Sequence, residues 1–218
     1  MLQDNKVFAE ICSIQLITNA SEALREQYKL TDRQRSLGLV TLTLDDIGYA
    51  AIDEATKATE VSVIYAQSFY AGSDYASGPF SGEFIGIIAG ETPEEVKSGL
   101  DSIQQSVQST FFFEKINNND NHLIFAQTIS SCGTYLAKEN GVAPGQALAY
   151  LIAPPIEALV GVDAALKAAD VEVCQLFSPP TETNFAGAIL TGSQSSCDAA
   201  VATFREKVQQ MTLNPLYY

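Results

Sequence analysis

The sequence IDEATKATEVSV, residues 52–63, decides the fold because the chain repeats it as VDAALKAADVEV, residues 162–173, 110 positions later and without a gap. Six positions are identical, pairing Asp53, Ala55, Lys57, Ala58, Val61 and Val63 with Asp163, Ala165, Lys167, Ala168, Val171 and Val173. Each copy predicts a short helix with small or apolar residues on one side, followed by a strand in which valines alternate with polar residues. The repeat therefore indicates two copies of one folding unit.

The repeat extends on both sides of this segment. The matching pairs are residues 7–17 with 122–129, 36–44 with 146–154, and 82–107 with 185–208. In the last pair an apolar strand ends at Gly90 or Gly192 and leads into an amphipathic helix. Each copy then reads strand, helix, strand, helix, strand, strand, helix. The predicted fold class is α+β, with two domains of about 100 residues each.

The boundary between the copies is predicted from TFFFEKINNNDN, residues 110–121, where three phenylalanines precede an Asn-rich stretch. Three adjacent aromatic residues cannot all face one core, and an Asn-rich stretch is typical of a loop. We therefore expect a first domain over residues 1–113, a linker over 114–121 and a second domain over 122–218.

Composition excludes several classes of partner. The 218 residues include 12 basic and 26 acidic side chains, and the net charge of −14 opposes binding to nucleic acid phosphates. No window has the roughly 18 uninterrupted apolar residues of a membrane helix, and the first residues lack the pattern of a secretory signal. We expect no nucleic acid, no membrane and a cytoplasmic location. The four cysteines are scattered singly and are expected to be buried, small apolar residues.

Catalytic groups are sparse in this sequence. Every Ser-His or Cys-His mechanism would have to use His122, the one histidine in the chain, and it opens a predicted strand. No Cys/His metal spacing and no phosphate-binding glycine motif is present. We therefore expect no enzyme activity, no metal and no cofactor.

Three acidic residues are candidates for binding a cation. Asp45 and Asp46 are predicted to lie side by side in a turn that ends the strand at residues 36–44, and a helix is expected over about 50–59. Glu83 opens an otherwise apolar strand after the loop at 68–82, which is rich in Gly, Ser, Tyr and Phe. Such acids bind an ammonium group or a metal, or are simply solvated. Residues 111–113 offer an interface, a gate or plain core packing.

Several longer motifs resemble a known family. They are RSLGL at 35–39, DEATK at 53–57, YAGS at 70–73, AYLIAPPIEA at 149–158, DAALKAADVE at 163–172 and PPTETNFAGAILTGSQSSC at 179–197. These are similar to the tandem-domain shell proteins of bacterial microcompartments, of the ethanolamine-utilisation L-like type. The related tandem shell protein of ethanol-utilising compartments is the near alternative.

The resemblance implies two circularly permuted, ferredoxin-like shell domains in one chain, and a homotrimer whose six domains form a pseudohexagonal tile. Such tiles join other shell proteins around enzymes and carry gated pores for small polar metabolites such as ethanolamine. The family's pore and ligand site falls here on Asp45, Asp46 and Glu83, the acids that would hold a primary ammonium by charge-assisted hydrogen bonds. Its other positions match Tyr70, Phe112, Phe113 and Thr183.

Two hypotheses of different classes follow. The first is a structural shell protein with pores, in the shell of a bacterial microcompartment. The second is a soluble two-domain amine-binding or sensor protein, in which the acids bind the ligand and the loop around Tyr70 closes over it.

Overall fold

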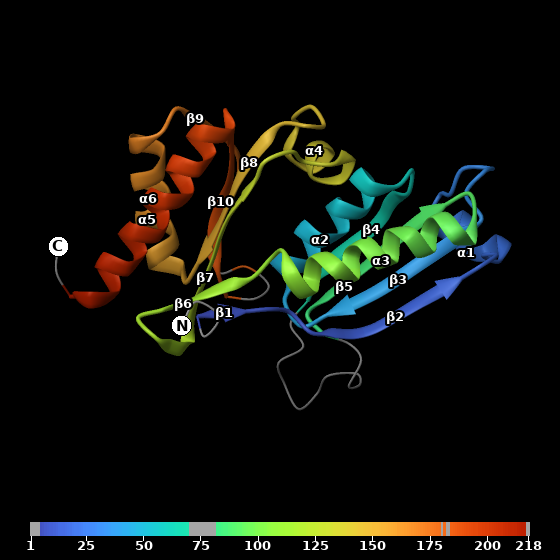
Figure 1. Ribbon diagram of the computed structural model, residues 1–218, viewed down its shortest axis with the longest axis horizontal. Helices are drawn as coiled ribbons and strands as arrows, with labels where there is room; N and C mark the ends of the chain where they lie inside the picture. The colour runs from blue at the N-terminus through green and yellow to red at the C-terminus, as the bar shows by residue number, and fades with distance from the viewer. Residues whose placement is uncertain (1–4, 70–81, 180, 182–183, 217–218) are drawn as a thin grey trace. The chain divides into compact units, whose positions relative to one another are not determined.

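The computed structural model describes residues 5–69, 82–179, 181 and 184–216, and they form two compact units (Figure 1). The first unit consists of Phe8–Phe111 with Gly133–Leu136. The second unit consists of Met1–Val7, Phe112–Cys132 and Ala137–Tyr218. Each contains a sheet with helices against it, so the α+β prediction is confirmed.

The first unit has the order of elements that the sequence predicts. They are β2 (Ile11–Ile17), α1 (Glu22–Gln27), β3 (Ser36–Leu42), α2 (Asp45–Ala58), β4 (Ser62–Ser68), β5 (Phe84–Gly90) and α3 (Pro93–Ser109). The four strands form an antiparallel sheet in the order β2-β3-β5-β4. Figure 1 shows α2 and α3 side by side on one face of this sheet. Leu24 of α1 and Tyr28, the residue after this helix, pack against Leu37 and Ile87, whose side chains leave the sheet on the opposite face.

The second unit repeats this order and adds a small extension to its sheet. Its elements are β1 (Lys6–Val7), β6 (Phe113–Ile116), β7 (Asn119–Ile129), most of α4 (Thr134–Asn140), β8 (Ala147–Ala153), α5 (Pro155–Ala168), β9 (Val171–Phe177), β10 (Ala186–Gly192) and α6 (Gln194–Leu213). The sheet order is β1-β6-β7-β8-β10-β9, and α5 and α6 pack together against one face. Gly141, at φ +66°, follows α4 in the left-handed conformation that suits glycine at a helix end.

The segment expected as a linker forms a β-hairpin instead. Residues 114–121 include most of β6, a turn and the start of β7, and Asn117 and Asn118 in that turn have positive φ angles of 53° and 56°. A turn with two positive φ angles favours Asn, so the Asn-rich composition marks a tight hairpin rather than a loose connection. The strand expected over residues 7–17 is also divided, because β1 pairs with β6 while β2 pairs with β3.

The helix α2 begins five residues earlier than the sequence prediction. It starts at Asp45 and not near residue 50, so the two acids lie in its first turn and not in a loop. Negative side chains in the first turn suit the helix dipole, and Ile47, Ala51 and Ala55 continue the buried stripe at helical spacing. Like α5, the helix has 14 residues, and the two helices start 110 positions apart.

The cysteines follow the prediction in part. All four are free; Cys132 and Cys197 are buried, whereas Cys12 and Cys174 are only half-buried. Burial is the main cause that raises the thiol pKa of Cys12, Cys174 and Cys197, which keeps them protonated and unreactive at neutral pH. None of the helices in the described part of the chain combines the length and apolar character that crossing a membrane requires.

Candidate ligand site and its relatives

The first turn of α2 brings two carboxyl groups to the end of the first unit's sheet. The expectation that Asp45 and Asp46 lie in a turn is wrong, because they are helical, and at 9% and 6% exposed they are largely shielded from water. The Asp45 carboxylate accepts a hydrogen bond of 3.0 Å from the backbone N–H of Asp46. Leu44, the residue before the helix, is extended and caps it with no side-chain bond. The positive end of the helix dipole therefore stabilises the two negative charges.

Glu83 reaches the same place from the neighbouring strand. Its N–H donates to the carbonyl of Leu42 at 2.7 Å, and its carbonyl accepts from the N–H of Phe69 at 3.0 Å. Gly82 makes this approach feasible, because it has φ +67° and a Cβ there would lie 2.1 Å from the Leu42 oxygen. The end of β3 and the start of β5 are therefore fixed side by side, with Glu83 beside the first turn of α2.

Tyr49 completes the described part of the site. Its hydroxyl donates to Ser68 Oγ at 3.1 Å and accepts from the N–H of Ser68 at 2.8 Å. Its ring lies edge-on to Phe84, with ring centroids 5.0 Å apart. Sequence reasoning missed Tyr49 and Ser68. Tyr49 follows Asp45 by one helical turn, a signal that becomes visible only when the helix is recognised to begin at Asp45.

The electrostatics of this site are those of a cluster of like charges. Burial raises the pKa of Glu83, and the charge of Asp45 raises it further. Burial also raises the pKa of Tyr49 and outweighs the opposing hydrogen bonds from Ser68, and the charges of Asp45 and Asp46 add smaller contributions that raise it further. A cation placed among these groups would reverse these effects, because an opposite charge favours the ionised carboxylate. The electrostatics at this end of the first unit therefore favour a positively charged neighbour.

The three consecutive phenylalanines lie in three different environments. Phe111 is 4% exposed and belongs to the first unit, while Phe113 is 2% exposed and packs against Phe125 in the second unit with ring centroids 5.3 Å apart. Phe112 lies between them in the chain; Lys6 Nζ is 3.8 Å from its ring centroid, and its carbonyl accepts from Gln127. Phe113 is therefore a core residue. The acids belong to the first unit, and Phe112 and Phe113 to the second.

Three candidates from the sequence remain. Tyr70 and Thr183 lie outside the described residues. His122 is in the second unit, where its Nε2 atom lies 3.2 Å from a carboxylate oxygen of Glu157. Within the described residues, no group of three or more His, Cys, Asp and Glu side chains is arranged to hold a metal ion.

Comparison with known proteins defines the class. Residues 36–118 match the BMC domain, a segment that begins at β3 and includes α2, Glu83 and α3. The fold and the duplicated sequence thus mark a chain built from domains of this class.

Near full-length relatives identify the family. The chain is 49% identical over 215 residues to the bacterial microcompartment shell protein EutL of Clostridium perfringens, covering 99% of each chain. The crystal structure of the ethanolamine utilization protein EutL from Leptotrichia buccalis superposes with a TM-score of 0.94 at 44% identity, covering 98% of this chain and 99% of that one. The chain belongs to the EutL family of bacterial microcompartment shell proteins.

A more distant structure shares the fold alone. EtuB from Clostridium kluyveri has a TM-score of 0.77 at 17% identity, covering 93% of this chain and 88% of that chain. The identities favour the EutL type over the EtuB-like alternative.

Proposed function

We propose that this chain is a structural shell protein of a bacterial microcompartment in the cytoplasm, that it catalyses no reaction, and that it forms homotrimeric, pseudohexagonal tiles with other shell proteins. The observation that carries the proposal is the 49% identity to an EutL shell protein over 99% of both chains. In this proposal each of the two units corresponds to one shell domain, the first over about residues 1–113 and the second over about 122–218. The pores of the tile admit small polar metabolites of an ethanolamine pathway.

The acids of the first unit are the proposed ligand site. Asp45, Asp46 and Glu83 lie at one end of the sheet. A primary ammonium group there would donate charge-assisted hydrogen bonds to all three carboxylates. A relative is named for ethanolamine utilization, and ethanolamine carries such a group. Tyr70, Phe112, Phe113 and Thr183 are the other proposed pore residues, and the buried Phe113 would act by supporting its neighbour Phe112 from the core.

Assembly is tested by native mass and electron microscopy. A trimer of 23.4 kDa chains has a mass of about 70 kDa in light scattering, and sheets or closed shells form at high protein concentration. A chain that stays monomeric at every concentration would contradict the shell proposal and leave the amine-binding or sensor protein as the leading function.

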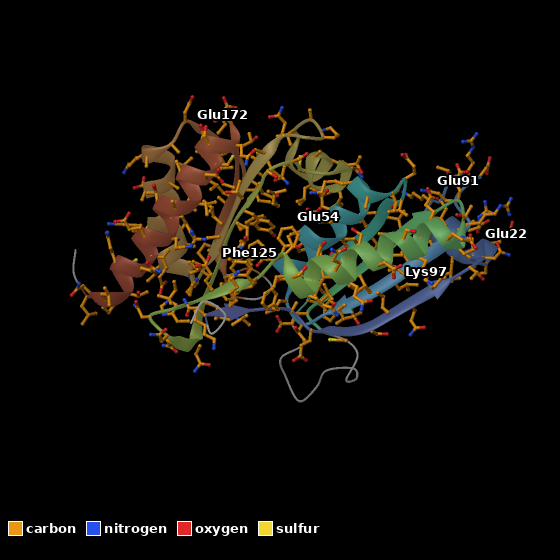
Figure 2. All side chains as sticks on the ribbon, in the orientation of Figure 1. Glu22, Glu54, Glu91, Lys97, Phe125 and Glu172 are labelled. Carbon is orange, nitrogen blue, oxygen red and sulfur yellow. The ribbon has the colours of Figure 1, made fainter. Side chains whose placement is uncertain are left out.

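Ligand binding is tested by calorimetric titration with ethanolamine. Asp45→Asn combined with Glu83→Gln removes two charges while keeping side-chain volume, and we expect at least about tenfold weaker binding. Glu172→Gln, an exposed acid on β9 of the second unit that Figure 2 labels, is the matched control and should bind as the parent does. Unchanged binding by the double variant would contradict the site.

The pH dependence follows from the raised pKa of Glu83. The ammonium group binds the ionised carboxylate, so affinity rises by up to about tenfold per pH unit as pH rises from about 4 to the raised pKa, and then levels off. In the free protein, the contribution of Glu83 to folding stability changes with pH in the opposite direction. The protonated Glu83 contributes stability at pH values below the ordinary glutamate pKa, and this contribution is lost as pH rises through the raised value.

A further inference from the structure

One face of α5 in the second unit exposes large apolar side chains. Ile156 and Leu159 are 65% and 53% exposed. Asp163, one turn further along, has a side chain that is 63% exposed and pairs through one carboxylate oxygen with the exposed Lys167 at 2.6 Å. The spacings of three and four residues place Ile156, Leu159 and Asp163 on one stripe of the helix. The two exposed aliphatic residues and the neighbouring aspartate form a small surface patch, which can be buried away from water only against a partner.

The matching stripe of α2 in the first unit is covered. Counting back 110 positions, Ile156, Leu159 and Asp163 correspond to Asp46, Tyr49 and Asp53. Asp53 is fully buried and its carboxylate accepts from the N–H groups of Gly133 at 2.6 Å and of Leu136 at 2.9 Å. The Tyr49 ring stacks on that of Tyr135, with centroids 6.4 Å apart. Residues 133–136, which belong to the first unit, are therefore the cover of this stripe.

The contact is close and specific. A Cβ on Gly133 would lie 2.2 Å from Thr56 Oγ1 and 2.8 Å from a carboxylate oxygen of Asp53, so the backbone approaches as only glycine permits. Thr56 Oγ1 also accepts from the N–H of Thr134 at 3.0 Å. Burial raises the pKa of Asp53, and its two backbone donors oppose that shift. Asp53 therefore anchors residues 133–136 against α2.

The repeat identifies the segment that would cover α5. Residues 133–136 follow β7 at the start of α4; in the first copy the same place, after β2 and at the start of α1, is residues 21–24. The backbone supports this equivalence, because Ala20 N–H donates to the carbonyl of Arg35 at 2.7 Å and Cys132 N–H donates to that of Gln146 at 2.9 Å. Both bonds join the residue just before the short helix to the residue just before the next strand.

The segment at residues 21–24 is accessible. Ser21 and Ala23 are exposed, Leu24 is half-buried, and the Ser21 hydroxyl makes no capping bond to α1. Figure 2 shows Glu22, in the same turn, at the surface of the first unit. The chain therefore contains one complete contact, between α2 and residues 133–136. It also contains the two surfaces of a second such contact, α5 and residues 21–24.

We propose that the α5 stripe of Ile156, Leu159 and Asp163 is covered by residues 20–24 of a second copy of this chain, with Asp163 accepting hydrogen bonds from backbone N–H groups at Ser21 and Leu24. This inference rests on the proposed shell function and names the residues through which one chain meets the next. The occupant is a second copy because the covering segment is the chain's own repeat. Backbone N–H groups at the start of α1 complement the carboxylate, and Ile156 adds apolar area where α2 carries Asp46.

The second contact differs from the first at several positions, and two of them change how closely the backbone approaches. Leu166 replaces Thr56, and Ser21 replaces Gly133. The Thr56 hydrogen bond is therefore lost and the backbone approaches less closely, while the apolar contribution grows. Each chain donates one surface and receives another, so the contact is heterologous, and a chain of such contacts either closes into a ring or continues as a filament.

The direct test is cross-linking between differently marked chains. Chains carrying Ser21→Cys and chains carrying Asp163→Cys are co-expressed and oxidised, and the joined peptides are identified by mass spectrometry. We expect a disulfide between position 21 of one chain and position 163 of the other. Asp163→Cys is replaced in the control by Asp198→Cys, an exposed aspartate of α6, which should give no such product.

The energetic test uses native mass as a function of concentration. Leu159→Asp and Asp163→Asn change residues that are exposed in the single chain, so the thermal transition of the dilute chain should be preserved. Each should raise the dissociation constant of the assembly by about thirtyfold or more, because a buried acceptor or an apolar anchor is lost. Asp198→Asn should leave it unchanged.

The outcomes separate this inference from the shell function. A parent mass of three chains with no 21–163 disulfide and no effect of the α5 substitutions would overturn the interface and leave the shell function standing. A parent chain that is monomeric at all concentrations would overturn both. A specific disulfide, together with dissociation of the variants but not of the Asp198→Asn control, is the expected result.

Discussion

Helices α2 and α5 have the same length and the same place in their units, but they begin with opposite chemistry. Asp45 and Asp46 open α2, whereas Pro155 and Ile156 open α5. On the adjacent strand Glu83 corresponds to Phe185, which packs against Phe113 with ring centroids 5.9 Å apart. The duplication thus preserved the frame while its ends diverged, and only the first copy carries the candidate cation site.

The cores of the two copies diverged in a compensated way. Gly48 of α2 faces Phe84, and a Cβ there would lie 2.5 Å from the Phe84 ring. The corresponding residues of the second copy are Ala158 and Ala186, both fully buried. The large ring in the first copy goes with a glycine, and the small side chain in the second copy goes with an alanine, so neither copy forces a Cβ against a ring at this place. The paired exchange thus avoids overpacking, which destabilises a core.

The largest predicted effect is at the buried anchor of the first copy. Asp53→Ala leaves the N–H groups of Gly133 and Leu136 without their acceptor, and we expect the free energy of unfolding in urea to fall by about 3 kcal/mol. Asp53→Asn retains one acceptor oxygen and should cost about half as much. Asp198→Ala, at an exposed position, should change it by less than about 0.5 kcal/mol. Equal losses at Asp53 and Asp198 would contradict the anchor.

A smaller effect is expected where the cores differ. Gly48→Ala forces the new methyl group against Phe84 and should cost about 2 kcal/mol of unfolding free energy. Phe84→Ala alone leaves a cavity and should cost about 3–5 kcal/mol. The double variant recreates the alanine pair of the second copy, so its loss should be at least about 1 kcal/mol smaller than the sum of the single losses. Strict additivity in this double-mutant cycle would refute compensation.

The smallest predicted effect concerns a feature that both copies keep. The hydroxyl of Thr92 accepts from the N–H of Glu95 at 3.2 Å at the start of α3, and that of Ser193 accepts from the N–H of Ser196 at 3.1 Å at the start of α6. Thr92→Ala and Ser193→Ala should each cost about 1 kcal/mol in chemical denaturation. A cap that costs nothing in one copy would show that the copies diverged at this position too.

Local patterns predicted most of the fold. The repeat, the alternation in the strands and the helical stripes place every helix and most strands, because these features depend on residues near in sequence. Boundaries were harder to predict. The start of α2 was missed because two adjacent aspartates are common in turns, and the hairpin at Asn117 and Asn118 was missed because an Asn-rich stretch is also typical of a loose connection.

The candidate site was predicted only in part for a related reason. Asp45, Asp46 and Glu83 stand out as acids beside apolar strands, and a resemblance to a family groups them. Their burial, and the roles of Tyr49 and Ser68, come from β3, β4 and β5 lying side by side. Phe112 and Phe113 look alike in the sequence, yet one lies under Lys6 and the other in a core.

The sequence by itself determined that this chain is a duplicated α+β protein, because duplication and periodicity are written in residue order, and its motifs carried the resemblance to shell proteins. Only the tertiary structure decided that Asp53 is a buried anchor while its repeat partner Asp163 is exposed. The two aspartates share the pattern of their neighbours, and what separates them is the segment at residues 133–136, some 80 positions from Asp53 in the chain. Whether an aspartate is buried depends on which distant segment packs against it, and the local sequence pattern does not specify that segment.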